Sequence, residues 1–258
     1  MSCWSLRCVD LCEGLANVQH IDDFFLAGCG LSSFDFVDMA SLRSIGDGCL
    51  SKTAQLVDVR LMNLPQLASI GKGLLQDSGA LQRVRMANLP QLETIGDSFA
   101  AATPRLFSCE VTNCPSLRTI GERFLNGSGL TTFAPSGLAA VTTIGSNWMS
   151  DCHHLRSFTG AVLPSLRHIS SYFLSGCNGL RYFDSSGLGS VGGIDQCFLA
   201  DCHALREDNI DFAGFTAVRK VDFRAFIRSH ELPAKARQRL GKALQQLVHA
   251  SNEKGTQR

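Results

Sequence analysis

Apolar residues recur along this chain with a period of about 25 residues. Isoleucine followed by glycine occurs five times at steps of 24 or 25 residues: Ile45-Gly46, Ile70-Gly71, Ile95-Gly96, Ile120-Gly121 and Ile144-Gly145. When the units are aligned, equivalent positions form a column. The isoleucine column continues without the glycine at Ile21, Ile169, Ile194 and Val221. An aliphatic residue precedes each by three positions, and a bulky pair such as Phe124-Leu125 follows it. The chain therefore consists mainly of about nine copies of one unit.

A leucine opens the second half of each unit, and strict alternation of apolar and polar residues follows it. Examples are LVDVRLM at 56–62 and LQRVRMA at 81–87. A period of two predicts a short strand with one buried face. Because a unit this short cannot bury its apolar side alone, neighbouring units must stack and share one core. The pattern predicts a repeat solenoid with a parallel β-sheet on one side and turns about 4.8 Å apart.

The remaining segments predict the connections and the ends. The bulky pair lies in a stretch too short for an α-helix, which favours a helical or 3₁₀ turn, and the glycine after isoleucine suits a turn with positive φ. Residues 223–250 predict a C-terminal cap with an amphipathic α-helix, because Pro233 fits a first turn and four apolar residues form one stripe. That stripe consists of Ala236, Leu240, Leu244 and Leu247. The predicted divisions are a solenoid over 1–222, this cap, and a disordered basic tail over 251–258.

The columns together read L-x-x-I-G-x-x-F-L, followed by C-x-x-L-x-x and an apolar residue. This combination resembles the leucine-rich repeat superfamily, specifically its BspA-like class, over about residues 3–222. The resemblance implies a leucine-rich repeat array that serves as a binding surface and carries no catalytic residues. Similar arrays occur in bacterial surface adhesins and in multi-copy proteins of parasitic flagellates.

The chain opens in the middle of a unit, because CWSLRCVDLCEGL matches its second half and no cap precedes it. A bare solenoid end would expose core side chains and unpaired strand groups. We expect either that the native chain is longer here or that a partner or second copy covers this end. A second function therefore stays open, that of a structural or assembly subunit that docks end-on through this turn.

Cysteine and histidine are adjacent in SDCHHLRSF at 150–158 and in ADCHALRED at 200–208. In register, the column of Cys152, Cys177 and Cys202 also contains Thr53 and Ser78, which indicates a small, weakly polar position. Zinc needs about four converging ligands, whereas His153 and His203 are two turns apart, about 10 Å. We predict no metal and no cofactor. The three cysteines stack within the Cα separation of a disulfide, so their redox state stays open.

Composition excludes several classes of function. The formal charge is +1, but residues 224–258 contain eight basic and two acidic residues, so residues 1–223 carry −5. This acidic body argues against nucleic-acid binding, and no apolar run reaches the roughly 18 residues of a membrane span. No catalytic cluster or phosphate-binding fingerprint occurs, so we predict a protein that is not an enzyme.

The start of the chain has no secretory signal pattern. The eleven cysteines are an odd number and are not spaced like a compact disulfide scaffold. Both observations favour a reducing compartment, although a cell-surface location stays open if the chain is a fragment.

The outward positions of the predicted strands are the candidate binding surface. They are Ser33, Asp35, Asp58, Arg60, Arg83, Arg85, Ser108, Glu110, Thr132, Ala134, Ser157, Thr159, Tyr182, Asp184, Glu207 and Asn209. Three arginines on neighbouring turns can give forked contacts to an acidic partner. We predict that a protein or glycan binds through Asp58, Arg60, Arg83, Arg85, Glu110, Tyr182 and Asp184. The alternative is an ordinary charged sheet face with cross-strand ion pairs that contribute little.

Overall fold

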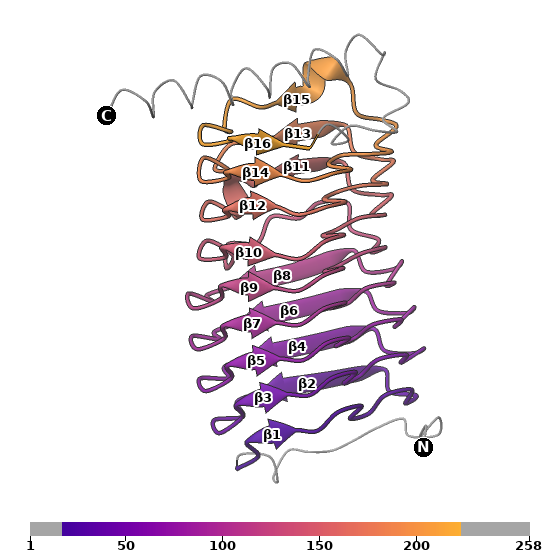
Figure 1. The fold of residues 1–258 in the computed structure, drawn as a ribbon. Coiled ribbons are helices and arrows are strands. Elements are labelled where there is room, and N and C mark those ends of the chain that lie inside the picture. Colours follow the sequence, from indigo (N-terminus) through magenta and orange to yellow (C-terminus); the bar gives the residue numbers. More distant parts are fainter. Residues whose placement is uncertain (1–16, 223–258) are drawn as a thin grey trace, which may run out of the picture.

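Stacked turns form an elongated column in the computed structural model, which describes residues 17–222 (Figure 1). About eight turns lie in this range, and most of them contribute one longer strand and one two-residue strand. All strands pair in parallel with the strand one turn away. The predicted solenoid is therefore confirmed, and its Ile-Gly period corresponds to one turn.

The longer strands form the predicted sheet, here called the long-strand face. Its strands are β2 (Ser33–Val37), β4 (Asp58–Met62), β6 (Arg83–Ala87), β8 (Ser108–Thr112), β11 (Ser157–Thr159), β13 (Tyr182–Asp184) and β15 (Ile210–Asp211). In β4, Val59 and Leu61 are buried whereas Arg60 is exposed, as the alternation predicts. The pairing Phe34↔Val59↔Val84 keeps each apolar column in register along the sheet.

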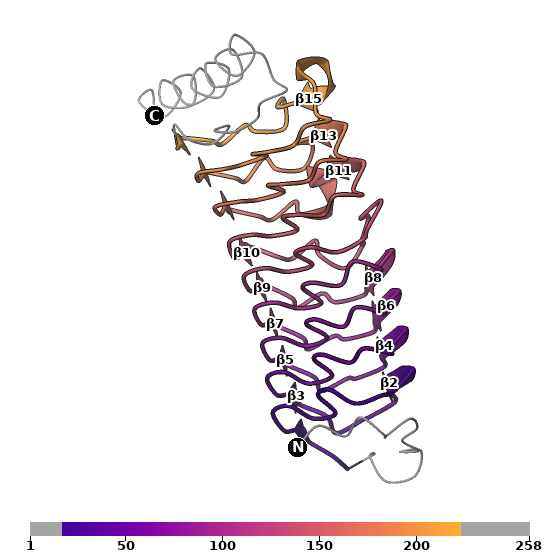
Figure 2. The same ribbon diagram turned by 90° about the vertical axis from the view of Figure 1, so that its right-hand side faces the viewer.

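A second row of parallel pairing runs along the isoleucine column, where we had predicted a sheet on one side only. Its strands are β1 (His20–Ile21), β3 (Ser44–Ile45), β5 (Ser69–Ile70), β7 (Thr94–Ile95), β9 (Thr119–Ile120), β10 (Thr143–Ile144), β12 (His168–Ile169), β14 (Gly193–Ile194) and β16 (Lys220–Val221). Figure 2 shows this row opposite the long-strand face. Two residues per turn are too few for the period-two signal to be recognised in the sequence.

The glycine after isoleucine does not have the positive φ that we predicted. It is required by close approach: a Cβ on Gly96 would lie 2.6 Å from the carbonyl carbon of Gly71, in the turn before it. The amide of Gly96 donates to the oxygen of Ile70 at 2.8 Å. Glycine therefore allows two backbones to meet.

The segment after this glycine does not form the predicted helical turn. Positive φ angles alternate along it, at Gly48, Leu50 and Lys52 in one turn and at equivalent positions in the others. The amides of these residues therefore bond alternately to the turn before and the turn after. Leu50 donates to Phe25 O in the turn before, whereas Lys52 donates to Gln76 O in the turn after. One hydrogen bond within the segment remains, from Ser51 N to Gly48 O at 3.1 Å, and bonds between turns satisfy the amides on either side of it.

Both rows are interrupted near the middle of the array. The long-strand face has no strand between β8 and β11, so Thr132 and Ala134 are not strand residues as predicted. Pro135 lies in this gap and lacks the N–H that a ladder needs. Near the C-terminal end, Glu207 and Asn209 are not outward strand residues as predicted, because Glu207–Asn209 form the 3₁₀ helix η2. The strand of this turn starts at Ile210, which pairs with Phe183. A second 3₁₀ helix, η1, covers Gly160–Val162.

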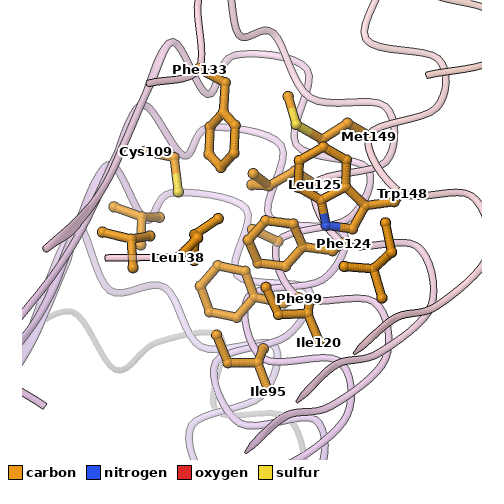
Figure 3. Close-up of a cluster of buried hydrophobic side chains, with 14 of the residues drawn as sticks. Ile95, Phe99, Cys109, Ile120, Phe124, Leu125, Phe133, Leu138, Trp148 and Met149 are labelled. Atoms are coloured by element: carbon orange, nitrogen blue, oxygen red, sulfur yellow. The ribbon is translucent and has the colours of Figure 1, made fainter. Parts of the chain in front are cut away.

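The core lies between the two rows, and aromatic rings stack along it (Figure 3). Trp148 lies between Phe124 and Phe173, with ring centroids 5.9 and 5.1 Å away. Its indole Nε1 is buried and has no hydrogen-bond partner in the described part of the chain. The stack crosses the interruption and keeps the two parts of the array in one continuous core.

The predicted mid-unit start, capping helix and basic tail fall on residues 1–16 and 223–258, outside the described residues. They stay predictions. No helix within residues 17–222 is long and apolar enough to cross a membrane.

Candidate functional site

Five of the seven predicted binding residues lie together on the long-strand face. Asp58, Arg60, Arg83, Arg85 and Glu110 line one depression of ≈ 360 Å³ over β2, β4, β6 and β8. They meet because outward positions on adjacent parallel strands are one inter-strand distance, about 4.8 Å, apart. The predicted binding set omitted one charged residue of this lining, Asp35 on β2, although its outward position was recognised.

Every arginine in this depression forms an ion pair with a carboxylate on a neighbouring turn. Arg60 donates to Asp35 through Nε at 2.9 Å and through a second N–H group. Arg83 Nε lies 2.6 Å from Asp58 Oδ2, and Arg85 Nε lies 2.8 Å from Glu110 Oε2. Six charges therefore form three pairs that balance in sign.

The pairs orient the arginines but stabilise the fold little. Side chains on both sides of each pair are one third to one half exposed, so water screens the attraction. Hydrogen bonding to Asp35 raises the pKa of Arg60, and bonding to Glu110 raises that of Arg85, so both stay charged. Because exposed pairs are weak, a partner can exchange them for its own charges at low cost.

Tyr182 and Asp184 lie apart from this group, on β13. Tyr182 is 46% exposed and presents an aromatic ring to solvent. Asp184 accepts hydrogen bonds from the Ser186 amide at 2.7 Å and the Thr159 hydroxyl at 3.2 Å. Burial raises its pKa, but the bonds from Ser186 and Thr159 outweigh this effect and lower it. Asp184 therefore stabilises a turn, and the structure does not bring it to the arginines.

The column that contains Cys152, Cys177 and Cys202 is buried and structural, as its exchange with threonine and serine predicts. Each thiol donates to a carbonyl of the turn before: Leu125 at 3.2 Å, Met149 at 3.2 Å and Leu174 at 3.1 Å, respectively. Thr53 in the same column donates to Leu50 O at 2.9 Å. All three thiols are free. A weak donor of small size is what this column requires.

The adjacent histidine positions do not share this environment. His153 is exposed, and its Nδ1 lies 2.8 Å from Gly176 O, so the tautomer protonated at Nδ1 fits. Within residues 17–222, no three His, Cys, Asp or Glu side chains lie close enough to hold a metal ion.

We predict that the buried thiols stay unreactive while the protein is folded. Burial raises the pKa of Cys49, Cys109 and Cys202 to about 12 and that of Cys114 to about 11. Thiolate is the reactive form, so these groups stay protonated at pH 8 and become ionised only as the pH rises toward these values.

Titration with Ellman's reagent checks this prediction. Eight of the eleven cysteines are free and buried in the described range, so at most three should react promptly at pH 8. All eleven should react in guanidinium chloride without reductant. Fast reaction of all eleven in the folded protein would contradict the burial, and fewer than eleven after unfolding would reveal a disulfide.

Comparison with known proteins identifies the repeat. The family model described as a BspA type leucine rich repeat region matches residues 2–131 and 103–206, in six copies. No protein in the curated set matches the chain.

Two solved structures are similar in fold. A leucine-rich repeat protein from Bacteroides ovatus ATCC 8483 has a TM-score of 0.56 at 18% identity, over 89% of this chain and 62% of that one. The leucine rich repeat protein of T. pallidum has a TM-score of 0.54 at 17% identity, over 72% of this chain and 82% of that one. The present chain thus spans 62% of the Bacteroides protein, and the likeness concerns the fold alone.

Proposed function

The chain belongs to the family of BspA-type leucine-rich repeat proteins, and we propose that it is a non-catalytic platform that binds a protein or glycan through the long-strand face. The matching family is a repeat family and indicates no catalytic activity. A rigid ladder of hydrogen-bonded strands holds the outward side chains of this face in fixed positions. Outward residues can therefore vary for recognition while the inward ones maintain the core.

One observation carries this proposal: Arg60, Arg83 and Arg85 gather in one depression beside three carboxylates. Since the charges balance, a partner with both signs fits this surface better than a purely acidic one. Arginine suits such exchange because its planar guanidinium can form forked hydrogen bonds with carboxylates. Tyr182 offers a separate aromatic contact on the same face.

Charge reversal at the depression tests the proposal. The variant Arg60→Glu/Arg83→Glu places carboxylates beside Asp35 and Asp58, where the wild type has ion pairs. We expect capture of the partner from extracts of cells that make this protein to fall at least about tenfold, since like charges across an interface cost several kcal/mol. Quantitative mass spectrometry of the captured proteins and glycans measures the loss.

The matched control is Arg105→Glu/Arg123→Glu, which makes the same charge change at two exposed loop arginines outside the depression. Its capture should equal that of the wild type. If both double variants keep the partner, or both lose it, the long-strand face is not the binding surface. The end-on alternative concerns the N-terminal turn, outside the described residues, and stays a prediction that light scattering can check.

A further inference from the structure

A groove of ≈ 1190 Å³ runs along the array on the segments that connect the longer strands to the two-residue strands. Its lining comes from five successive turns, from Asn113 to Ala217. Four inter-turn spacings make it about 19 Å long. Pockets for single small molecules usually have volumes of about 300 to 1,000 Å³, so this groove suits a segment of a linear polymer.

Side-chain size explains why the groove lies in the C-terminal part of the array. The column that contains Gln66 and Gln91 in earlier turns contains Ala140, Ser165 and Ser190 in the groove. A neighbouring ladder of side-chain amides also stops at its edge: Asn88 donates to Asn63, and Asn113 donates to Asn88, each at 2.9 Å. Gly137, the equivalent residue of the next turn, has no side chain to continue it. Small residues therefore leave the surface open here, whereas Gln66 and Gln91 occupy the same column in two earlier turns.

Two arginines give the groove its charge. Arg118 and Arg167 occupy the same column two turns apart, about 10 Å, with Thr142 between them. Arg118 Nη1 donates to Pro115 O at 3.0 Å and to Ala140 O at 3.4 Å, which holds its guanidinium against the wall. The lining contains no Asp or Glu among the described residues, and no ion pair there joins either arginine to a carboxylate. The groove is thus a positive site on an acidic body.

We propose that this groove binds an acidic polysaccharide with one carboxylate on every second sugar. Arginine pairs with carboxylates through forked hydrogen bonds, and two sugars are about as long as the two turns that separate Arg118 from Arg167. The rest of the lining consists mainly of hydroxyls, alanines and glycines, which suit a polyhydroxylated chain. It has no aromatic or large aliphatic pocket for the anchor residues that dominate peptide recognition.

The chain's own C-terminal segment is a poor occupant, because residues 224–258 carry a formal charge of +6 and would be repelled. The site is also separate from the long-strand face. Its proposal therefore does not rest on the function proposed above, and variants of Arg60 and Arg83 should leave it intact.

Fluorescence polarisation with labelled hyaluronate oligosaccharides tests the proposal, because hyaluronate carries one carboxylate per disaccharide. We expect saturable binding that weakens as salt screens the charges, and no binding of neutral dextran. Poly-glutamate serves as the acidic peptide. If poly-glutamate binds through the same arginines at least as tightly as hyaluronate, the ligand is an acidic peptide and the assignment to a polysaccharide is overturned.

Variants place the binding in the groove. Arg118→Ala/Arg167→Ala should weaken hyaluronate binding at least about tenfold, whereas Arg43→Ala, in the same column but outside the groove, should leave it unchanged. Ala140→Gln fills the groove with the residue that earlier turns have in this column and should also block binding. Unchanged melting temperatures show that all variants are folded. Binding that survives both the double arginine variant and Ala140→Gln would overturn the proposal.

Discussion

Replacing Ile95 by asparagine is expected to lower the free energy of unfolding by about 4 kcal/mol. Ile95 is 1% exposed and lies on β7 between Ile70 and Ile120, which pair with it on either side. The change removes a buried aliphatic side chain worth about 1.5 to 3 kcal/mol. It also leaves an amide without partners, which costs about 1 to 3 kcal/mol more.

The neighbouring residue provides the matched control. Thr94 lies on the same strand but points outward, so Thr94→Asn should change the stability by less than about 0.5 kcal/mol. Urea denaturation of both variants measures the difference from the wild type. A loss of less than about 1 kcal/mol for Ile95→Asn would show that the isoleucine column does not face the core.

Gly96→Ala is expected to destabilise the protein by about 3 kcal/mol, although it adds only one methyl group. The new Cβ would lie 2.6 to 2.8 Å from Gly71 C, Gly71 O and Lys72 N. All three are backbone atoms, so no side chain can move aside. The two turns must separate, and this strains the hydrogen bond from Gly96 N to Ile70 O.

Gly79→Ala should stabilise the protein, in contrast to Gly96→Ala. A Cβ at Gly79 has no atom within 4 Å, and its φ is not positive, so alanine fits without strain. Alanine restricts the unfolded chain more than glycine and should stabilise the fold by about 0.4 to 1 kcal/mol. Thermal or urea unfolding distinguishes the two variants. Equal effects would mean that conformational freedom, and not close approach, explains the glycine of the Ile-Gly pair.

The candidate site could be predicted only in part. The outward positions of Arg60, Arg83 and Glu110 follow from alternation within each strand, and their proximity follows from the repeat. The choice of ion-pair partners does not follow from the sequence. Arg60 has the carboxylates of Asp35 and Asp58 nearby, and only the structure shows that it pairs with Asp35. Asp184 was included for its outward position, whereas its hydrogen bonds to Ser186 assign it to a turn.

The sequence by itself determined the period, the core columns, the structural role of the cysteine column, and the register of the longer strands from β2 to β8 and between β11 and β13. It could do so because contacts in a solenoid join residues one period apart, so an alignment of units is also a map of neighbours. Only the tertiary structure decided why glycine follows isoleucine, how alternate φ angles link the turns, and where the groove with Arg118 and Arg167 opens. These features depend on how closely backbones approach and on side-chain volumes across several turns, which no single column of the repeat records.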